Sequence, residues 1–381
     1  MIPYGKHLID EDDIDAVVDV LRNQFLTQGQ MVPQFEQGLC EYTGAKYCVA
    51  VNSATSGLHV ACLTAGVSHG DLVWTVPNSF VASANCALYC GASVDFVDIN
   101  PTTRNIDIDS LEQKLLQAER RNRLPKALIV VHFSGLSCDM QKIRMLTKQY
   151  AIVLIEDAAH GLGGSYQQSK IGSCVYSDLT VLSFHPVKSI TSAEGGAVLT
   201  NQRSLHEKLL LFAKHGVTKD AAQYQGESHG PWYYQQLALG YNYRLSDLHA
   251  ALGLSQLKKL DAFIQRRTEI ADKYHQALAN LPLRLPVVDP QSQSAWHLYM
   301  IELTQHSRQA IYQQLHAKGV GVNVHYIPIH LQPYYQQLGF KQGDFPVSEH
   351  FYQHALTLPL FPSMTDAEQN HVIETLVEVL S

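Results

Sequence analysis

The residues best suited to chemistry gather between positions 127 and 201. Three segments there, ALIVVHFSGLSCDM, IVLIEDAAHGLGGSY and LSFHPVKSITSAEGGAVLTN, each begin with an apolar run typical of a buried strand. In open α/β sheets, ligands bind beyond the carboxyl ends of the strands. We therefore expect one crevice to receive the polar side chains that follow these runs, namely His132, Asp157, His160, Ser183, His185 and Lys188.

Two of these side chains suggest a cofactor. Asp157 follows the buried-looking run IVLIE, and a carboxylate there is costly unless it pairs with a cation or a proton donor, such as a protonated pyridine nitrogen. A lysine that is partly desolvated near other cationic groups has a lowered pKa and becomes a Schiff-base nucleophile, which suits Lys188. The plainer alternatives are that Asp157 caps the next helix and that Lys188 is solvated. The glycine pair at 195–196 favours the functional reading, because backbone can approach a ligand closely there.

A phosphate site is predicted where the run YCVAV ends and NSATSG opens a helix. Backbone N–H groups and the hydroxyls of Thr55 and Ser56 at a helix N-terminus bind anions, although an ordinary N-cap uses the same residues. Phe80, in PNSFVASAN, could lie flat on a planar cofactor or fill the core.

Alternating elements must position these groups. Strands are predicted over 47–51, 71–76, 93–99, 127–133, 152–157, 178–184 and 196–200, and helices over 53–66, 110–121, 137–150 and 204–215, several opening with a Ser or Asp N-cap. This pattern is typical of an α/β fold with a mostly parallel sheet between helices. Residues 216–245 lack clear periodicity and are interpreted as a long functional loop.

A second, smaller domain is expected after this loop. Residues 245–281 keep helical spacing for about ten turns, which predicts one long linking helix. Strand-like segments at 296–303 and 322–329, with helices at 307–319 and 366–380, then suggest a small α+β domain. We expect a large domain over 1–245, and the linking helix with the C-terminal domain over 246–381.

Composition excludes several classes of protein. A chain of 381 residues that is 46% hydrophobic can bury a large core, and a net charge of -7 from scattered acids makes a nucleic-acid partner unexpected. The sequence has no signal-peptide pattern and no apolar run long enough to span a membrane, so we expect a cytoplasmic protein. The seven cysteines form no CxxC pair and indicate reduced core thiols, and the 19 histidines show no HExxH, so no metal is expected.

Taken together, ordered motifs along the chain resemble those of the DegT/DnrJ/EryC1/StrS family of sugar aminotransferases, which have the fold-type I architecture and use pyridoxal 5'-phosphate (PLP). The resemblance covers nearly the whole chain. Its motifs are IPYGKHLIDEDDIDAV, FLTQGQMVPQFE, VNSATSGLH, PNSFVASAN, IEDAAHGLGGSY, SFHPVKSITSAEGGAV, GYNYRLSDLHAALGLSQL and LPLFPSMTDAE.

The resemblance implies roles for individual residues. Lys188 looks like the lysine that holds PLP through a Schiff base, and Asp157 like the acid that pairs with the pyridine nitrogen. The remaining cofactor contacts implied are the phosphate ligands Ser183, Thr55 and Ser56, the stacking ring Phe80, His160 on the other side of the cofactor or near its phenolic oxygen, and Asn242 as a phosphate contact from a second subunit. A homodimer with shared active sites is therefore implied. Ser189 departs from the family, since many relatives have Asn after the lysine.

Within the family, NVHYIPIHLQPYY and the surroundings of SAEGGAV look most like the transaminases of pseudaminic acid biosynthesis. These aminate C4 of a UDP-linked 4-keto-6-deoxy-N-acetylhexosamine with glutamate as the amino donor, and the expected kinetics are ping-pong. The sugar or diphosphate contacts implied are Tyr4, Gly5, His325, Tyr326 and His330. Alternatively, His325 and His330 form only local hydrogen bonds. The sequence leaves open the sugar's stereochemistry, its nucleotide and the amino donor.

Rival functions are a different nucleotide-linked keto-sugar as substrate, a PLP-dependent deoxygenase, a catalytically silent PLP-binding protein of the same fold and a nicotinamide oxidoreductase. The deoxygenases carry histidine in place of the lysine, so Lys188 argues against them. Retention of the cofactor positions weighs against a silent binder. No GxGxxG follows the first strands, which weighs against a nicotinamide enzyme.

Overall fold

The structure is a computed structural model that describes residues 1–287 and 289–380. Val288 and Ser381, which both fall within the expected C-terminal domain, lie outside the described residues. Among the residues described, no helix combines the length and apolar character needed to cross a membrane.

The centre of the molecule is a seven-stranded sheet in the order β1-β9-β8-β5-β4-β2-β3. Strand β9 is antiparallel to both of its neighbours, and the other strand pairs are parallel. The prediction of a mixed, mostly parallel sheet is confirmed, as are the strands themselves: β1 (Tyr47–Val51), β2 (Leu72–Thr75), β3 (Ser93–Phe96), β4 (Ala127–Val131), β5 (Val153–Asp157), β8 (Leu179–Ser183) and β9 (Gly196–Thr200).

Helices cover both faces of the sheet, which explains why β4, β8 and β9 are buried along their whole length. Alternate residues point to opposite faces: Val49 and Val51 enter one core, and Cys48 and Ala50 the other. The first face packs against α3 (Ala54–Thr64), α4 (Ala82–Tyr89) and α7 (Arg203–Ala213). The second packs against α2 (Met31–Thr43), α5 (Ile108–Arg120), α6 (Met140–Gln149) and α8 (Asp247–Leu257), with α1 (Glu11–Asn23) against α8.

Polar caps start most of these helices as expected. The side chains of Ser53, Asp107 and Asp139 accept hydrogen bonds from backbone N–H groups at the beginnings of α3, α5 and α6. The N-cap of α7 is Gln202, whose side chain makes no capping bond. The cap at Ser53 fixes the start of α3 where the phosphate site is predicted.

The prediction of one unbroken linking helix is wrong. Helix α8 ends at Leu257, and α9 (Leu260–Leu278) begins after a tight turn at Lys258 and Lys259, whose N–H groups bond to carbonyls three residues back. Lys259 also pairs with Asp10 and with Asp13, at 3.0 Å, on the N-terminal segment. The ion pairs and the tightened turn hold α8 on the sheet and send α9 away from it.

The C-terminal part has its own sheet and core. Strands β12 (Leu283–Arg284), β14 (Tyr299–Leu303) and β15 (Ala355–Leu358) form an antiparallel sheet, which packs against α9, α10 (Arg308–Ala317) and α13 (Asp366–Leu380). Short helices η3 (Ile329–Leu331), α11 (Pro333–Gln337) and α12 (Pro346–His354) connect α10 to β15. Strand β13 (Ser292–Gln293) instead joins β6 (Ser165–Tyr166) and β7 (Ser169–Lys170) of the first part.

The strand predicted over 322–329 is also wrong. Only Asn323 makes a ladder contact, with Thr357, before the chain leaves the sheet. Pro328 has no N–H to offer a strand partner, and the N–H of Ile329 donates to the carbonyl of Pro77 at 2.9 Å. The segment therefore crosses back to the large sheet, where it brings His325 and Tyr326 to the pocket described below.

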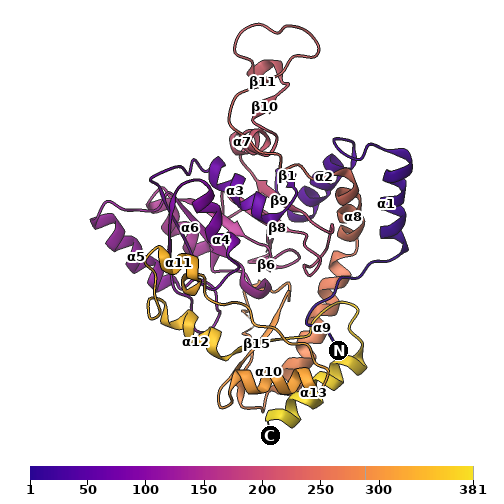
Figure 1. Ribbon diagram of the computed structural model, residues 1–381, viewed down its shortest axis with the longest axis vertical. Helices are drawn as coiled ribbons and strands as arrows, with labels where there is room; N and C mark the ends of the chain where they lie inside the picture. Colours follow the sequence, from indigo (N-terminus) through magenta and orange to yellow (C-terminus); the bar gives the residue numbers. More distant parts are fainter. Residues whose placement is uncertain (288, 381) are drawn as a thin grey trace.

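Residues 216–245 include an arm that projects from the body of the molecule (Figure 1). Its paired parts are β10 (Val217–Thr218) and β11 (Gln235–Gln236), with η2 (Ala221–Gln223) between them. Three large apolar side chains on the arm are exposed: Trp232 by 74%, Tyr234 by 58% and Leu239 by 78%. The structure thus has an exposed apolar arm where the sequence indicated a loop.

Candidate active site

A cavity of about 340 Å³ opens at the carboxyl ends of β4, β5 and β8. Its walls include the last residues of these strands, the beginning of α3 and the crossing segment of the C-terminal part. The lining contains most residues expected from the sequence: Tyr4, Thr55, Phe80, Asp157, His160, Ser183, His185, Lys188, His325 and Tyr326. One crevice therefore collects strand-end side chains, as predicted.

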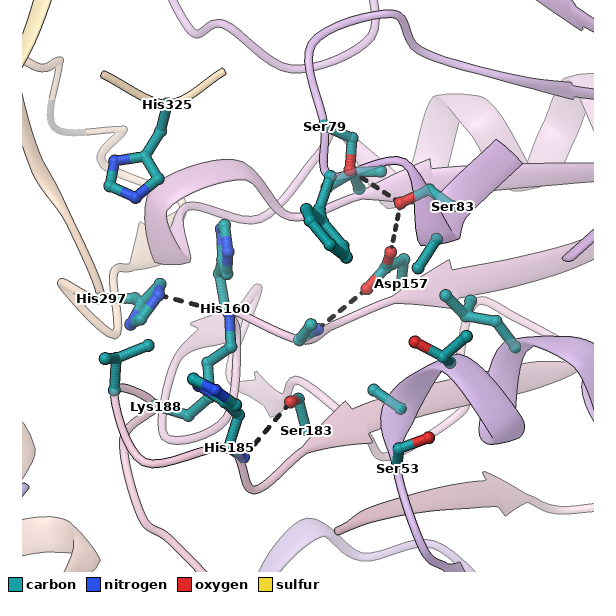
Figure 2. Close-up of a pocket in the computed structure, with 18 of the residues that line it drawn as sticks. Ser53, Ser79, Ser83, Asp157, His160, Ser183, His185, Lys188, His297 and His325 are labelled. Carbon is teal, nitrogen blue, oxygen red and sulfur yellow. Dashed lines mark hydrogen bonds between the residues drawn. The ribbon is translucent and has the colours of Figure 1, made fainter. Parts of the chain in front are cut away.

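Asp157 lies at one end of this crevice with only 4% of its surface exposed. Its Oδ2 accepts from the Ser83 hydroxyl at 2.6 Å, and its Oδ1 accepts from the Ala159 N–H at 3.1 Å. Ser79 is 2.7 Å from Ser83 and completes the chain of hydroxyls visible in Figure 2. Among the described residues no basic side chain forms an ion pair with Asp157, so the buried carboxylate faces the cavity with only neutral donors.

The beginning of α3 provides an anion cradle. Ser53, Ala54 and Thr55 line the cavity, and the first N–H groups of a helix have no partner within the helix. Gly196 lies so close that a Cβ there would be 2.6 Å from the backbone nitrogen of Ala54. Gly196 therefore serves a close contact inside the protein, between β9 and this cradle, whereas Gly195 lines the cavity as expected.

Two expected phosphate contacts do not line the cavity. The hydroxyl of Ser56 is 3.0 Å from that of Ser53 and donates to Asn52 Oδ1 at 2.6 Å. Asn242 is exposed on the segment that follows the arm, and its carbonyl accepts a 3.5 Å bond from the Asn52 amide. Both lie next to the cradle through Asn52, and neither faces the cavity of this chain.

Phe80 lines the cavity with 58% of its surface exposed. This exposure excludes the alternative that Phe80 fills the core. The centroid of its ring is 6.3 Å from that of Tyr326. An aromatic ring exposed at a pocket wall suits a planar ligand that covers it.

Lys188 follows β8 in a turn in which its N–H bonds to the carbonyl of His185 at 2.9 Å. Its side chain is only partly exposed and lines the cavity. Burial lowers the pKa of Lys188 to about 8, and the negative charge of Asp157 opposes that decrease. Near neutral pH the unprotonated share of this amine is therefore much larger than that of an exposed lysine, and the unprotonated amine is the nucleophile.

Histidines surround the amine of Lys188 (Figure 2). His160 is 6% exposed, accepts from the Ser134 N–H at its Nδ1 and has its Nε2 3.2 Å from the Tyr326 hydroxyl. Burial, and then the charge of Lys188, hold the pKa of His160 well below its usual value. The imidazole is therefore neutral at physiological pH.

His325 and Tyr4 form the outer part of the same wall. His325 is 6% exposed, its Nδ1 is 2.7 Å from the Thr357 hydroxyl, and its ring is 5.3 Å from that of Tyr4. Burial, and then the charge of Lys188, lower the pKa of His325 to about 3. Like His160, His325 is a neutral donor or acceptor in the cavity.

The structure keeps three further expected residues out of the cavity. His132 is fully buried, where its Nε2 bonds to Glu156 at 2.6 Å and its Nδ1 accepts from the Cys138 N–H. His330 is also fully buried and pairs with Glu349 at 2.9 Å. Gly5 is not in the lining, although a side chain there would approach Val187. The expected convergence of His132 on the crevice is thus contradicted, and His330 shows the local hydrogen bond of the plainer alternative.

Sequence reasoning missed four polar residues of the cavity lining, namely Ser79, Ser83, Glu194 and His297. Ser83 lies in PNSFVASAN, three residues after Phe80, so helical spacing after Phe80 could have found it. His297 lies just before β14 in a segment interpreted as a plain strand, and no sequence signal marked it. No group of three or more His, Cys, Asp or Glu side chains within the described ranges is arranged to hold a metal ion.

These groups fit PLP. The cradle at α3 suits a phosphate, the exposed face of Phe80 suits a planar ring, and the unpaired carboxylate of Asp157 suits a protonated pyridine nitrogen. The amine of Lys188 opens into the same cavity with a lowered pKa and suits a bond to an aldehyde carbon.

Comparisons with known proteins agree with this fit. The model of the DegT/DnrJ/EryC1/StrS aminotransferase family matches residues 7–377. The chain is 38% identical over 386 residues to the spore coat polysaccharide biosynthesis protein SpsC of Bacillus subtilis, covering 100% of this chain and 97% of SpsC. It is also 38% identical over 384 residues to the UDP-4-amino-4,6-dideoxy-N-acetyl-beta-L-altrosamine transaminase of Campylobacter jejuni, covering 100% of this chain and 98% of that protein.

A solved structure has a similar fold over the whole chain. PseC of Helicobacter pylori, an aminotransferase involved in the biosynthesis of pseudoaminic acid, superposes with a TM-score of 0.90 at 33% identity. The superposition covers 100% of this chain and 99% of that chain. The expected fold-type I architecture is therefore confirmed. The chain belongs to the DegT/DnrJ/EryC1/StrS aminotransferase family, and it is a PLP-dependent sugar aminotransferase.

Proposed function

We propose that this aminotransferase moves an amino group from glutamate to C4 of a UDP-linked 4-keto-6-deoxy-N-acetylhexosamine, as in pseudaminic acid biosynthesis. The observation that carries the proposal is the cavity itself. The amine of Lys188, with its lowered pKa, and the buried carboxylate of Asp157, which has no cationic partner among the described residues, both line it. The similarity to the C. jejuni transaminase and to PseC over the whole chain supports the choice of sugar.

In this proposal Lys188 and Asp157 carry the chemistry. PLP, when bound, supplies an electron sink for the carbanion that forms next to nitrogen. Lys188 holds the cofactor, and its free amine later takes the proton from the α-carbon of the amino donor and delivers a proton at C4 of the sugar. Asp157, fixed by Ser83 and by the Ala159 N–H, keeps a proton on the pyridine nitrogen.

The other contacts divide between cofactor and substrate. Thr55, Ser56 and Ser183 are proposed to hold the phosphate with the N–H groups of α3, and Phe80 and His160 to lie on the two sides of the ring. Ser56 would have to turn from Asn52 to do so. For the sugar nucleotide we propose Tyr4, His325 and Tyr326, which line the outer wall. Gly5 and His330 are left out of this set because they do not line the cavity.

The identity of the sugar is tested by comparing two candidate substrates. The purified enzyme with PLP and glutamate would receive the UDP-linked 4-keto-6-deoxy-N-acetylhexosamine of L-altro type or its epimer at C5, and the amino sugars formed would be identified by mass spectrometry and NMR. The proposal predicts amination of the L-altro substrate with a kcat/KM at least about tenfold higher. A preference for the epimer would favour the alternative of a different keto-sugar, which the equal identity to SpsC also suggests. No turnover of any keto-sugar, with PLP bound, would favour a silent binder.

We also propose a cytoplasmic homodimer with shared active sites. The arm with exposed Trp232, Tyr234 and Leu239 supports an apolar contact with a second copy of the chain. Asn242 is exposed next to Asn52 and the cradle, a position compatible with reaching the phosphate of the second subunit. Light scattering on the purified protein should give twice the chain mass of 42.5 kDa, and a monomer would contradict this proposal.

The division into domains at residue 245 is retained as a proposal with one refinement. The apolar residues of α8 and of the first turn of α9 pack with the core of the large sheet, whereas Ile270 and later residues of α9 pack with the C-terminal core. This packing favours a boundary inside α9. Limited proteolysis that releases a stable fragment ending near residue 245 would instead favour the original boundary.

A further inference from the structure

His297 contacts the amine of Lys188, and the proposed chemistry gives it no role. Its Nε2 is 3.5 Å from Lys188 Nζ, a contact that Figure 2 marks with a dashed line. This separation is at the outer limit of a hydrogen bond, and catalytic hydrogen bonds are often long before substrate binds. His297 is 4% exposed, so water does not readily replace this contact.

The other ring nitrogen of His297 shows which atom carries the proton. Nδ1 is buried, and no described residue offers it a hydrogen-bond partner. A buried N–H without an acceptor is rare and costly, whereas a buried lone pair without a donor is tolerated more often. The proton therefore resides on Nε2, and Nε2–H donates to the lone pair of an unprotonated Lys188 amine.

The charges around the two groups favour this state. Burial, and then the charge of Lys188, hold the pKa of His297 well below its usual value. Further groups that face the pair are His160 after β5, His325 on the crossing segment, Arg267 on α9 and Asp157 at the end of β5. Among them only Asp157 is acidic, and it is already held by Ser83 and the Ala159 N–H. A second positive charge on His297 is thus disfavoured.

Two neighbours hold the imidazole in place. Its ring lies against that of His160, with centroids 4.3 Å apart. The guanidinium of Arg267, 2% exposed, donates to the carbonyls of Trp296, His297 and Leu360 at 3.2, 3.4 and 3.2 Å. Arg267 forms no ion pair with any described acid, so its donors are available to this backbone.

We propose that His297 is a positioning residue that donates its Nε2–H to the amine of Lys188, which favours the unprotonated form of that amine and aims it into the cavity. The role rests on the proposed function, because it matters only if Lys188 is the group that moves protons. Held in this way, the amine has its lone pair fixed before each proton transfer, and protonation of Lys188 breaks the bond and releases the amine.

The test measures the protonation of Lys188 itself rather than turnover. The PLP-free full chain would be labelled briefly with acetic anhydride from about pH 6 to about pH 10, and acetylation of each lysine would be read by mass spectrometry. Exposed Lys148 and Lys208 serve as internal references. The variants are His297→Phe, which removes the donor, and His297→Gln, whose amide N–H can take the position of Nε2–H. His316→Phe, in α10 and outside the cavity lining, is the matched control.

For the wild type, the labelling midpoint of Lys188 is expected near pH 8. We expect His297→Phe to raise it by about half a unit to one unit, because the unprotonated amine loses its donor. His297→Gln should restore most of the wild-type midpoint, and His316→Phe should leave it unchanged. An unchanged or lower midpoint in a folded His297→Phe would overturn the proposal, since a lower value would mean that His297 accepts a hydrogen bond from the ammonium group instead of donating one to the amine.

Failure of the inference and failure of the proposed function give different results. Borohydride reduction of the wild type with PLP, followed by mass spectrometry, reports whether Lys188 bears the cofactor at all. If it does not, the proposed function fails whatever the midpoints are. If it does and the midpoint of His297→Phe does not rise, only the role of His297 is lost. The unfolding temperature of each variant shows whether it is folded.

Discussion

The two sides of the cavity are built in different ways. On the acid side, Asp157, Ser83 and the beginning of α3 all come from one sheet and its helices, and backbone N–H groups and hydroxyls fix them. On the base side, Lys188 meets His297 and His325, which come from the C-terminal part. The acid side is thus built by the large sheet and its helices alone, whereas the base side depends on how the C-terminal part packs against them.

The two sides also differ in the polar groups that surround Asp157 and Lys188. Asp157 accepts hydrogen bonds only from neutral donors, the Ser83 hydroxyl and the Ala159 N–H. Lys188 is surrounded by buried neutral imidazoles, and burial lowers its pKa to about 8. In the proposed chemistry, Asp157 pairs with a protonated ring nitrogen and Lys188 acts as the base, and proton transfer at carbon requires both roles.

The largest expected effect is at the base itself. Lys188→Ala should lower kcat/KM of sugar amination at least about a thousandfold, because no other described amine lines the cavity. Steady-state kinetics with saturating PLP measure this loss. Lys170→Ala, on β7 and outside the cavity lining, is the control and should keep wild-type activity. If kcat/KM of Lys188→Ala stayed within tenfold of wild type, Lys188 would not be the base and the contrast between the two sides would be lost.

On the acid side, Asp157→Asn should lower kcat/KM about a hundredfold or more, because an amide cannot hold a proton on the pyridine nitrogen through charge. The amide oxygen can still accept from the Ala159 N–H, so the unfolding temperature should change little. Kinetics and thermal unfolding of the same preparation separate the two effects. Loss of activity only in proportion to loss of folded protein would reduce Asp157 to a structural residue.

Stability should reveal the dependence of the base side on the packing of two parts. Arg267→Met leaves three buried carbonyls without their donor and should cost about 2 to 4 kcal/mol in the free energy of unfolding. Arg266→Met, one residue earlier on α9, removes partly exposed ion pairs with Glu269 and Asp366 and one hydrogen bond to the Met364 carbonyl, and it should cost only about 1 kcal/mol. Denaturant unfolding measures both, and equal losses would show that Arg267 has no special role.

The smallest expected effect is a pH dependence of stability at Lys188. Its pKa falls from 10.5 to about 8 on folding, so between these values the unfolded chain binds more protons and stability rises with pH. Lys188→Met should therefore stabilise the PLP-free protein by about 2 kcal/mol near neutral pH, and this gain should shrink as pH rises above 8. Unfolding at pH 7 and pH 9.5 checks the sign. A gain that grows with pH would mean that the pKa of Lys188 is not lowered.

The acid side and the sheet were the parts open to prediction from sequence. Apolar runs that end in polar residues predict both the strands and the edge at which Asp157, Ser183 and Lys188 meet. The same argument failed for His132, which lies past the end of β4 but turns down to Glu156. Alternate residues face opposite ways, so Glu156 points into the protein where its neighbour Asp157 points into the cavity.

The histidines of the base side, His297 and His325, could not be predicted from strand ends in this way. His297 belongs to a segment with the pattern of a plain strand, and its place beside Lys188 depends on how the C-terminal part packs. The segment with His325 also has a strand pattern, yet Pro328 and the bond from Ile329 to Pro77 take it across to the cavity. The expectation that His325 belongs to the site rested on the family resemblance. Tertiary contacts of this kind leave no local periodicity to detect.

The central claim is that Lys188 is the amine that holds PLP in this aminotransferase. The most direct measurement is borohydride reduction of the enzyme with PLP, digestion and mass spectrometry of the peptide that carries the reduced cofactor. We predict a single adduct on Lys188, lost when glutamate is added before the borohydride. An adduct on another lysine, or none at Lys188 under conditions in which the enzyme aminates a sugar, would contradict the account.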